Sequence, residues 1–315
     1  MELDEIISKS QDFANIQKEI KNSKLSKSVL LYSKDSVYSF SFAKVVASLL
    51  LGDGEIVDVH DIKIKLDSHP DVKVYPQKEK LLVADSEEIV MESFIKPIFA
   101  EKKVFIIKGI DASTESAQNK LLKILEEPPQ NVYFILTATS ENLVLPTIKS
   151  RCNKIELAKL SIDQIKEVYS GRENLEIASI LSDGLVGKAE SLLNKKNLNQ
   201  FFENVLSIVT DMKSSKQVLV YSNRVLSAKE DFALFVEILS MIFEDLLFLK
   251  SGEEIKFKGY KNKLEGVKDE YSLNAICEIE KIFNKASKEI FYNTNQNIVI
   301  ENLLLNILEV KFVCK

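Results

Sequence analysis

The sequence has few of the features that mark secreted or membrane proteins. Its 315 residues include three cysteines, Cys152, Cys277 and Cys314. Their small number and wide spacing argue against a disulfide framework and favour a reducing compartment. The first residues, MELDEIISKSQDF, contain neither the basic stretch nor the apolar stretch of a signal peptide. We therefore expect a cytoplasmic protein.

The sequence also lacks an uninterrupted apolar run and an excess of basic charge. Its most apolar window, residues 232–250, is broken by polar side chains, of which Glu237, Ser240 and Glu244 fall on one helical stripe. This pattern predicts a buried helix with one polar edge and not a membrane span. With 42 Lys and Arg against 47 Asp and Glu, the net charge is −5. A stand-alone nucleic-acid binder is therefore not expected, because neutralising phosphates needs a basic surface.

What the sequence does contain is an alternation of β-rich and helical runs between residues 28 and 156. Strands are predicted at residues 28–33, 55–62, 72–76, 102–110 and 131–139. Helices are predicted between them, at residues 41–51, 86–99 and 113–129. Strands separated by helices predict βαβ units, and hence a mostly parallel sheet with helices on both faces.

Beyond residue 160 the strand signals disappear. Three short helical runs at residues 161–171, 174–184 and 185–196 are punctuated by glycine, and longer amphipathic helices follow. The length also suggests more than one hydrophobic core. We predict three domains: an α/β core at residues 1–158, a small three-helix lid at residues 159–196, and an all-α domain at residues 197–315.

The turn after the first predicted strand stands where a phosphate-binding loop would stand. Such a loop needs G-x-x-x-x-G-K-[ST], because glycines let backbone N–H groups close on the phosphates while the lysine and the hydroxyl meet phosphate and Mg²⁺. Here the four slots hold Ser33, Tyr38, Ser39 and Phe40, and a shift by one residue gives Lys34, Ser39, Phe40 and Ser41. Both frames predict a chain that binds no ATP. An ordinary β-turn-α connection would look the same at this one place.

The second half of a nucleotide site is altered at the end of the fourth predicted strand. An NTPase ends this strand in Asp-Glu, which holds Mg²⁺ and activates water. This sequence has Lys108 and Gly109 there, a reversed charge and no side chain. Because both halves are altered together, we interpret them as a degenerate ATP site rather than as a fold that never had one.

The most specific stretch is QNKLLKILEEPPQNVYFILTATSENLVLPTIKSRC, residues 118–152. It resembles the AAA+ clamp-loader subunits of bacterial DNA polymerase III, in which N-x-LLK-x-LEEPP, a strand ending at a sensor threonine, and LPTI-x-SRC follow in this order. The matching residues are Asn119, Leu121–Lys123, Leu125–Pro129, Thr139 and Leu145–Cys152. The resemblance is strong over about residues 25–156 and continues more weakly to the end. It implies an AAA+ core, a helical lid and a helical collar.

The resemblance implies a role for one arginine. In the family's Ser-Arg-Cys motif, here Ser150, Arg151 and Cys152, the arginine is a finger inserted into the ATP site of the neighbouring subunit. A guanidinium supplied in trans stabilises charge on the γ-phosphoryl group being transferred. The alternative is a solvated arginine at the end of a short helix, where the helix dipole favours a cation.

Departures from the family pattern indicate a non-ATPase member. Loader subunits usually carry a four-cysteine zinc module before HPD, but residues 51–71 contain no cysteine, so zinc is not expected and His60 and His69 are interpreted as ordinary polar positions. The lid slot for a sensor arginine holds Gly187, beside Lys188. This pattern resembles the delta-prime branch of the family. It implies no cofactor on this chain, gamma/tau and delta subunits as partners, and a sliding clamp and primed DNA reached through the complex.

Two other classes of function stay open at this point. Lys120 and Lys123 lie three residues apart on one predicted helix face. They resemble loader residues near the DNA backbone, or they belong to a solvated charged face. The chain could thus be an AAA+-derived nucleic-acid-binding or scaffold protein outside the clamp loader. An enzyme with a different centre has less support, because Glu126 and Glu127 are neighbours on a helix and cannot face each other as a catalytic pair.

Overall fold

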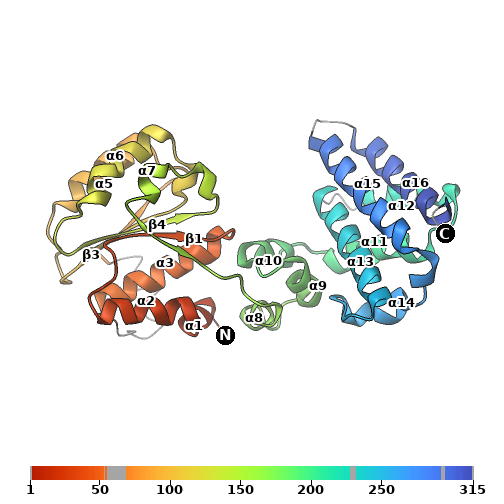
Figure 1. Cartoon of the computed structure of the whole chain (residues 1–315), viewed down its shortest axis with the longest axis horizontal. Coiled ribbons are helices and arrows are strands. Elements are labelled where there is room, and N and C mark those ends of the chain that lie inside the picture. Colours follow the sequence, from red (N-terminus) through yellow and green to blue (C-terminus); the bar gives the residue numbers. More distant parts are fainter. Residues whose placement is uncertain (1, 53, 55–68, 228–231, 292–294, 314–315) are drawn as a thin grey trace. The chain divides into compact units, whose positions relative to one another are not determined.

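The computed structural model describes residues 2–52, 54, 69–227, 232–291 and 295–313 (Figure 1). Contacts divide the chain into a sheet unit, residues 1–172 with 182–191, and a helical unit, residues 173–181 with 192–315. The predicted strand at residues 55–62 lies outside the described residues. So does most of the segment 51–71, in which no zinc module is expected, including His60. The three-domain division stays a prediction. In the described parts of the chain, no helix is long and apolar enough to cross a membrane.

The described part of the sheet unit contains five parallel strands. They are β1 (Ser28–Tyr32), β2 (Val72–Tyr75), β3 (Lys103–Ile107), β4 (Val132–Ala138) and β5 (Asn153–Glu156), in the spatial order β2-β3-β4-β1-β5. This confirms the predicted α/β class with a parallel sheet. The edge strand β5 was not predicted, because three of its four residues are polar or charged and most of it is exposed.

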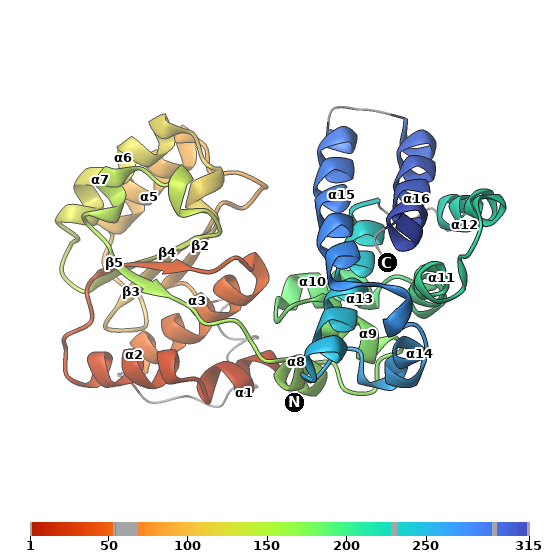
Figure 2. The same ribbon diagram turned by 45° about the vertical axis from the view of Figure 1, so that its right-hand side comes forward.

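Helices cover both faces of this sheet (Figures 1 and 2). On one face lie α1 (Leu3–Ser8), α2 (Gln11–Lys21) and α3 (Ser36–Leu51), and on the other α5 (Val83–Ser93), α6 (Glu115–Glu126) and α7 (Pro146–Lys149). Successive strand residues alternate between the two cores: Leu31 faces the first and Leu30 the second. From the predicted lid, α8 (Ile162–Val168) and α10 (Val186–Leu193) contribute Ile165 and Val186 to the first core.

Several helix boundaries differ from the predicted ones, and two of the differences have a clear local cause. α3 begins at Ser36, five positions before residue 41, because the Asp35 side chain caps it. α5 ends at Ser93 and not at residue 99. The residue before a proline is disfavoured in a helix, so Pro97 excludes a helical Lys96. The N–H groups of residues 98–100 then bond elsewhere.

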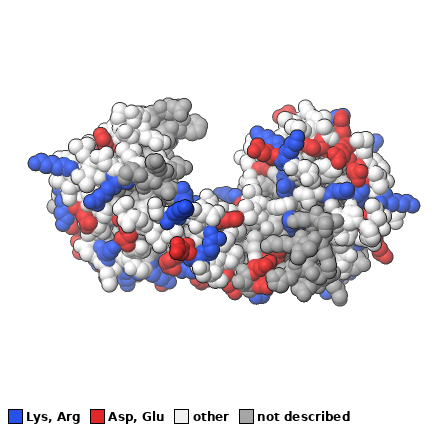
Figure 3. Space-filling view, turned by 180° about the vertical axis from the view of Figure 1, so that it is seen from behind, with Lys and Arg blue, Asp and Glu red and all other residues white. Residues whose placement is uncertain are grey.

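The helical unit confirms the predicted all-helical C-terminal part. It contains α9 (Leu175–Leu181), α11 (Leu198–Asp211), α12 (Ser215–Ser227), α13 (Phe232–Ser251), α14 (Lys261–Glu265), α15 (Leu273–Phe291) and α16 (Gln296–Val313). α15 and α16 lie side by side in both ribbon views (Figures 1 and 2). The Phe243 ring on α13 contacts the rings of Tyr271 and Phe283. On the face shown in Figure 3, basic and acidic side chains are interspersed over each unit.

Candidate functional site

The turn between β1 and α3 is short. It consists of Ser33–Asp35, since β1 ends at Tyr32 and α3 begins at Ser36. The Ser33 N–H donates to the Ala138 carbonyl at 3.1 Å, and the Asp35 N–H donates to Ser33 Oγ at 3.1 Å. Of the predicted loop positions, Ser33 therefore lies in the turn, whereas Tyr38, Ser39 and Phe40 lie in the first turns of the helix.

The Asp35 carboxylate occupies the donors at the start of α3. Its Oδ1 accepts from the N–H groups of Val37 at 2.9 Å and Tyr38 at 3.1 Å. Its Oδ2 accepts from the N–H of Gly187 at 3.0 Å, on α10. The side chain is buried. Free N–H groups at a helix N-terminus form an anion-binding position, and in this chain an internal carboxylate fills it.

Gly187, the predicted sensor slot, lies against this cap. A Cβ at Gly187 would stand 2.9 Å from Val37 Cγ2 and 3.2 Å from Asp35 Oδ1. Any larger side chain at this position would require the Val37 and Asp35 side chains to shift. The predicted lid slot therefore lacks the arginine, and its glycine packs closely against the side chains of Asp35 and Val37.

Tyr38 and Ser39 are turned into the protein. Tyr38 is 3% exposed, and its ring meets that of Phe42 edge-on, with 6.1 Å between centroids. Burial, with smaller contributions from the charges of Asp12 and Asp35, raises the pKa of Tyr38 to about 12. Ser39 Oγ donates to the Ser36 carbonyl at 3.2 Å. The Tyr38 side chain is therefore buried in the core, and the Ser39 hydroxyl is bonded within α3 itself.

The two altered halves of the predicted nucleotide site meet. The Lys108 ammonium lies 4.8 Å from the centroid of the Phe40 ring, and the Lys44 ammonium lies 4.9 Å from the same centroid. These are cation–π distances. Gly109 has the left-handed φ of 58°, and its N–H donates to Thr137 Oγ1 at 3.0 Å. An ammonium at this strand end repels a metal cation, whereas a carboxylate would attract one.

The predicted sensor threonine is bound within the chain. The Thr139 N–H and hydroxyl donate to Asp111 Oδ2 at 3.0 and 2.9 Å, and the Ser140 N–H donates to the same oxygen at 2.8 Å. Sequence reasoning missed Asp111. Its position three residues after the Lys108 slot, on the short helix that follows β3, is the signal that could have identified it.

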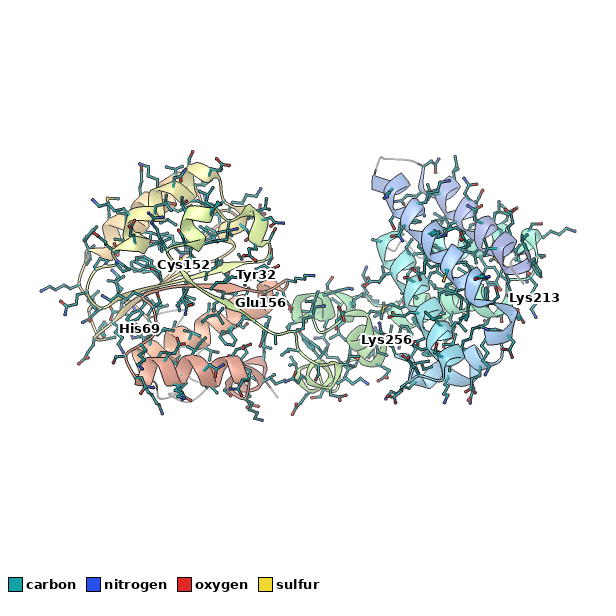
Figure 4. The ribbon with its side chains drawn as sticks, in the orientation of Figure 1. Tyr32, His69, Cys152, Glu156, Lys213 and Lys256 are labelled. Atoms are coloured by element: carbon teal, nitrogen blue, oxygen red, sulfur yellow. The ribbon has the colours of Figure 1, made fainter. Side chains whose placement is uncertain are left out.

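Arg151 lies just after α7 and points outward from the core. Its Nε donates to Glu126 Oε2 at 2.8 Å, its Nη2 lies 2.7 Å from the same oxygen, and its Nη1 donates to the Thr147 carbonyl at 3.0 Å. Ser150 Oγ donates to the Thr147 carbonyl at 3.1 Å. The next residue, Cys152, is buried in the second core, and burial raises the pKa of its thiol to about 12. Figure 4 labels Cys152 with Tyr32 and Glu156, which are paired on β1 and β5.

The two candidate DNA-contacting lysines are both exposed on α6. The Lys120 ammonium pairs with Glu87 on α5 at 2.8 Å, so its charge is partly offset within the chain. Within the described residues, no group of three or more His, Cys, Asp and Glu side chains could hold a metal. His69 instead accepts the Asp71 N–H at its Nδ1, 3.1 Å away.

Sequence reasoning also missed an exposed apolar segment after α5. Phe94, Ile98 and Phe99 are 70%, 70% and 79% exposed. The fully buried Asp71 carboxylate holds this segment, accepting from the N–H groups of residues 98, 99 and 100 at 2.6, 2.7 and 2.8 Å. Burial alone would raise the pKa of Asp71, but these donors outweigh it and leave the pKa lowered. The segment is a defined surface feature, because its backbone is fixed from the core.

Comparisons with known proteins show that the chain is similar to subunits of DNA polymerase III. Residues 8–161 match the family model described as DNA polymerase III, delta subunit. DNA polymerase III subunit gamma of Buchnera aphidicola subsp. Schizaphis graminum is 26% identical over 262 residues, 73% of this chain and 72% of the relative. Subunit tau of Bacillus subtilis is 24% identical over 237 residues, 65% of this chain and 42% of the relative.

A solved structure has a similar fold. It is the DNA polymerase III gamma subunit-related protein of Thermotoga maritima, with a TM-score of 0.53 and 17% identity over 95% of this chain and 99% of that one. Residues 8–161 are thus similar to the family described as DNA polymerase III, delta subunit, and longer stretches of the chain are similar to subunits named gamma and tau.

Proposed function

Because its N-terminal half matches that family, we propose that this chain is a delta-prime-type subunit of a DNA polymerase III clamp loader. It does not turn over ATP itself. It supplies Arg151 in trans to the ATP site of a neighbouring gamma/tau subunit, and so helps to load the sliding clamp onto primed DNA. The cytoplasm is the compartment in which this function would operate.

The observation that carries the non-ATPase part of the proposal is the Asp35 carboxylate. A bound nucleotide would need the N–H groups at the start of α3 for its phosphates, and Asp35 already uses those of Val37 and Tyr38. A phosphate brought to this place would also meet the negative charge of Asp35. Lys108 in the metal-binding position adds a second obstacle, since it would repel the Mg²⁺ that accompanies ATP.

The observation that supports the finger is the position of Arg151. Its side chain is 28% exposed beside α7, so it reaches the surface of the sheet unit while Cys152 fixes the neighbouring backbone in the core. The family resemblance implies that a neighbouring subunit covers this place. In the proposal, gamma/tau and delta subunits are the partners, and residues 197–315 form the collar through which they assemble.

Isothermal titration with ATP and Mg²⁺ tests the first part. We expect no binding heat from the isolated chain, with a subunit that carries an intact phosphate-binding loop as the positive control. Low-micromolar affinity in this chain would overturn the assignment as a non-ATPase member.

Steady-state ATP turnover and clamp loading by the reconstituted loader test the second part. Arg151→Ala should leave folding largely unchanged, because a surface ion pair such as that of Arg151 with Glu126 contributes about 0–1 kcal/mol. Turnover at the adjacent site should fall by on the order of 10³-fold, and total turnover in part, because the other sites keep their own fingers. Arg151→Lys should not restore it, since a point charge cannot replace the planar fork. Unchanged rates would reduce Arg151 to a helix-end residue.

A nucleic-acid-binding protein outside the loader is the other candidate function. The Lys120–Glu87 pair argues against it, because it offsets one of the two lysine charges that would face a DNA backbone. Electrophoretic mobility of primed DNA separates the two: the loader subunit should shift it only together with its partners. A shift by the chain alone would favour the alternative.

A further inference from the structure

Arg151 is held by one residue of its own chain, Glu126. Both the Nε and the Nη2 of Arg151 meet a single oxygen, Glu126 Oε2, at 2.8 and 2.7 Å. The third contact, from Nη1 to the Thr147 carbonyl at 3.0 Å, is made to the helix that ends just before Arg151. Two contacts converge on one carboxylate oxygen and the third goes to a backbone carbonyl, and together they orient the guanidinium.

Glu126 stands where a carboxylate is unfavourable by itself. It is the last residue of α6, and the partial negative charge of a helix C-terminus repels an anion. Both side chains of the pair are partly exposed, at 28% for Arg151 and 55% for Glu126. Surface ion pairs of this kind add little to folding stability. The pair therefore adds little to the stability of the fold, and its main geometric effect is to orient the guanidinium.

The contacts leave the guanidinium able to bind an anion. A guanidinium carries five N–H donors. The Glu126 oxygen accepts from Nε and lies 2.7 Å from Nη2 as an ion pair, and the Thr147 carbonyl accepts one N–H of Nη1. At least one N–H on each terminal nitrogen therefore remains. Two donors on adjacent nitrogens form the planar fork that matches two phosphate oxygens.

We propose that Glu126 is a positioning residue for Arg151: it holds the guanidinium with two donors free for the γ-phosphate oxygens of a nucleoside triphosphate bound by the neighbouring subunit. This inference rests on the proposed function. Glu127, the next residue, carries the same charge at the same helix end, and its backbone N–H bonds to Lys123 within α6. It supplies the matched control.

The first measurement uses the isolated chain. The sequence contains three arginines, Arg151, Arg172 and Arg224, so isotope labelling of arginine gives a simple side-chain NMR spectrum. Glu126→Ala should shift the Arg151 Nε–H resonance and accelerate its exchange with water, while Glu127→Ala should leave both unchanged. Glu126→Gln, which keeps an oxygen acceptor, should give an intermediate result. An unchanged resonance in Glu126→Ala would overturn the proposal.

The second measurement is ATP turnover at the adjacent site in the reconstituted loader. Glu126→Ala should lower kcat about threefold to fivefold with little change in KM, which is the upper part of the range for losing one exposed ion pair. Glu127→Ala should match the wild type. Combined with Arg151→Ala, Glu126→Ala should add no further loss, because both changes remove one function.

The outcomes separate the two proposals. If Arg151→Ala slows turnover and Glu126→Ala does not, the finger stands and the positioning role is refuted. If Glu126→Ala slows turnover equally in the presence and absence of Arg151, Glu126 acts by another route and the inference fails. If Arg151→Ala has no effect, the finger and the inference that rests on it are both refuted.

Discussion

Replacing Asp35 by alanine removes a carboxylate that joins two segments of the sheet unit. Its oxygens accept from the N–H groups of Val37, Tyr38 and Gly187. Loss of an aspartate N-cap costs about 1 kcal/mol. Leaving the Gly187 N–H without its acceptor costs about 1–3 kcal/mol more. We therefore expect the free energy of unfolding to fall by about 2–4 kcal/mol, or Tm by roughly 4–16 °C for a unit of this size.

Thermal and urea unfolding followed by far-ultraviolet circular dichroism measures this change, since the sequence contains no tryptophan for fluorescence. Glu87→Ala is the control: it also removes an acid from an ion pair, but that pair with Lys120 is about half exposed on both sides. It should cost less than about 0.5 kcal/mol.

Hydrogen exchange at the Gly187 amide tests the cause of the effect. In Asp35→Ala this amide should exchange faster, because its acceptor is gone, while amides in the middle of β3 and β4 should keep their protection until the whole unit opens. If the free energy of unfolding of Asp35→Ala were within about 0.5 kcal/mol of the wild type, and exchange of the Gly187 amide were unchanged, Asp35 would not be what holds α10 to the turn.

Two further predictions concern Asp71 and Gly184. The pKa of Asp71 is lowered in the folded state, so its contribution to stability is fully present above the unfolded value of about 3.9 and is lost as pH falls through the folded pKa. In urea unfolding between about pH 2 and 6, Asp71→Asn should therefore weaken the fall in the free energy of unfolding at acid pH. An unchanged dependence of that free energy on pH would contradict this. Gly184 has a φ of +77°, and a Cβ there would stand 2.1 Å from the Leu160 carbonyl oxygen. Gly184→Ala should therefore cost about 2 kcal/mol or more in calorimetry, whereas Gly171→Ala, with nothing within 4 Å of the added Cβ, should cost less.

The sheet could be predicted from local patterns where its strands are buried. β3 and β4 are apolar runs bounded by turn residues, and both are almost fully buried. β5 carries no such signal, because an edge strand needs no apolar side chains to pair with β1. The helix after β1 was predicted, but its first turn was not, since that turn depends on a cap and not on apolar spacing.

The sequence predicted several of the residues that belong to the candidate site, but not which of them contact one another. The sequence identified Tyr38, Phe40 and Lys108 as altered slots, but the approach of the Lys108 ammonium to the Phe40 ring needs the sheet order, in which β3 and β1 both flank β4. The bond between Asp35 and Gly187 joins residues 152 positions apart. The partner of Arg151 follows from the way α6 and α7 pack against one core. Such long-range pairings are set by tertiary packing, which periodicity does not encode.

The burial of Cys152 next to the partly exposed Arg151 makes its thiol a chemical reporter within the chain. The thiolate is the reactive form of cysteine, and a thiol whose pKa is raised to about 12 stays protonated at neutral pH. Alkylating reagents should therefore modify Cys277, which is exposed, at once, and Cys152 only when the backbone around the Ser-Arg-Cys motif opens. The alkylation rate of Cys152 thus measures how often the backbone around Arg151 opens locally. If a neighbouring subunit docks over that surface, as the proposed function requires, the alkylation rate should fall.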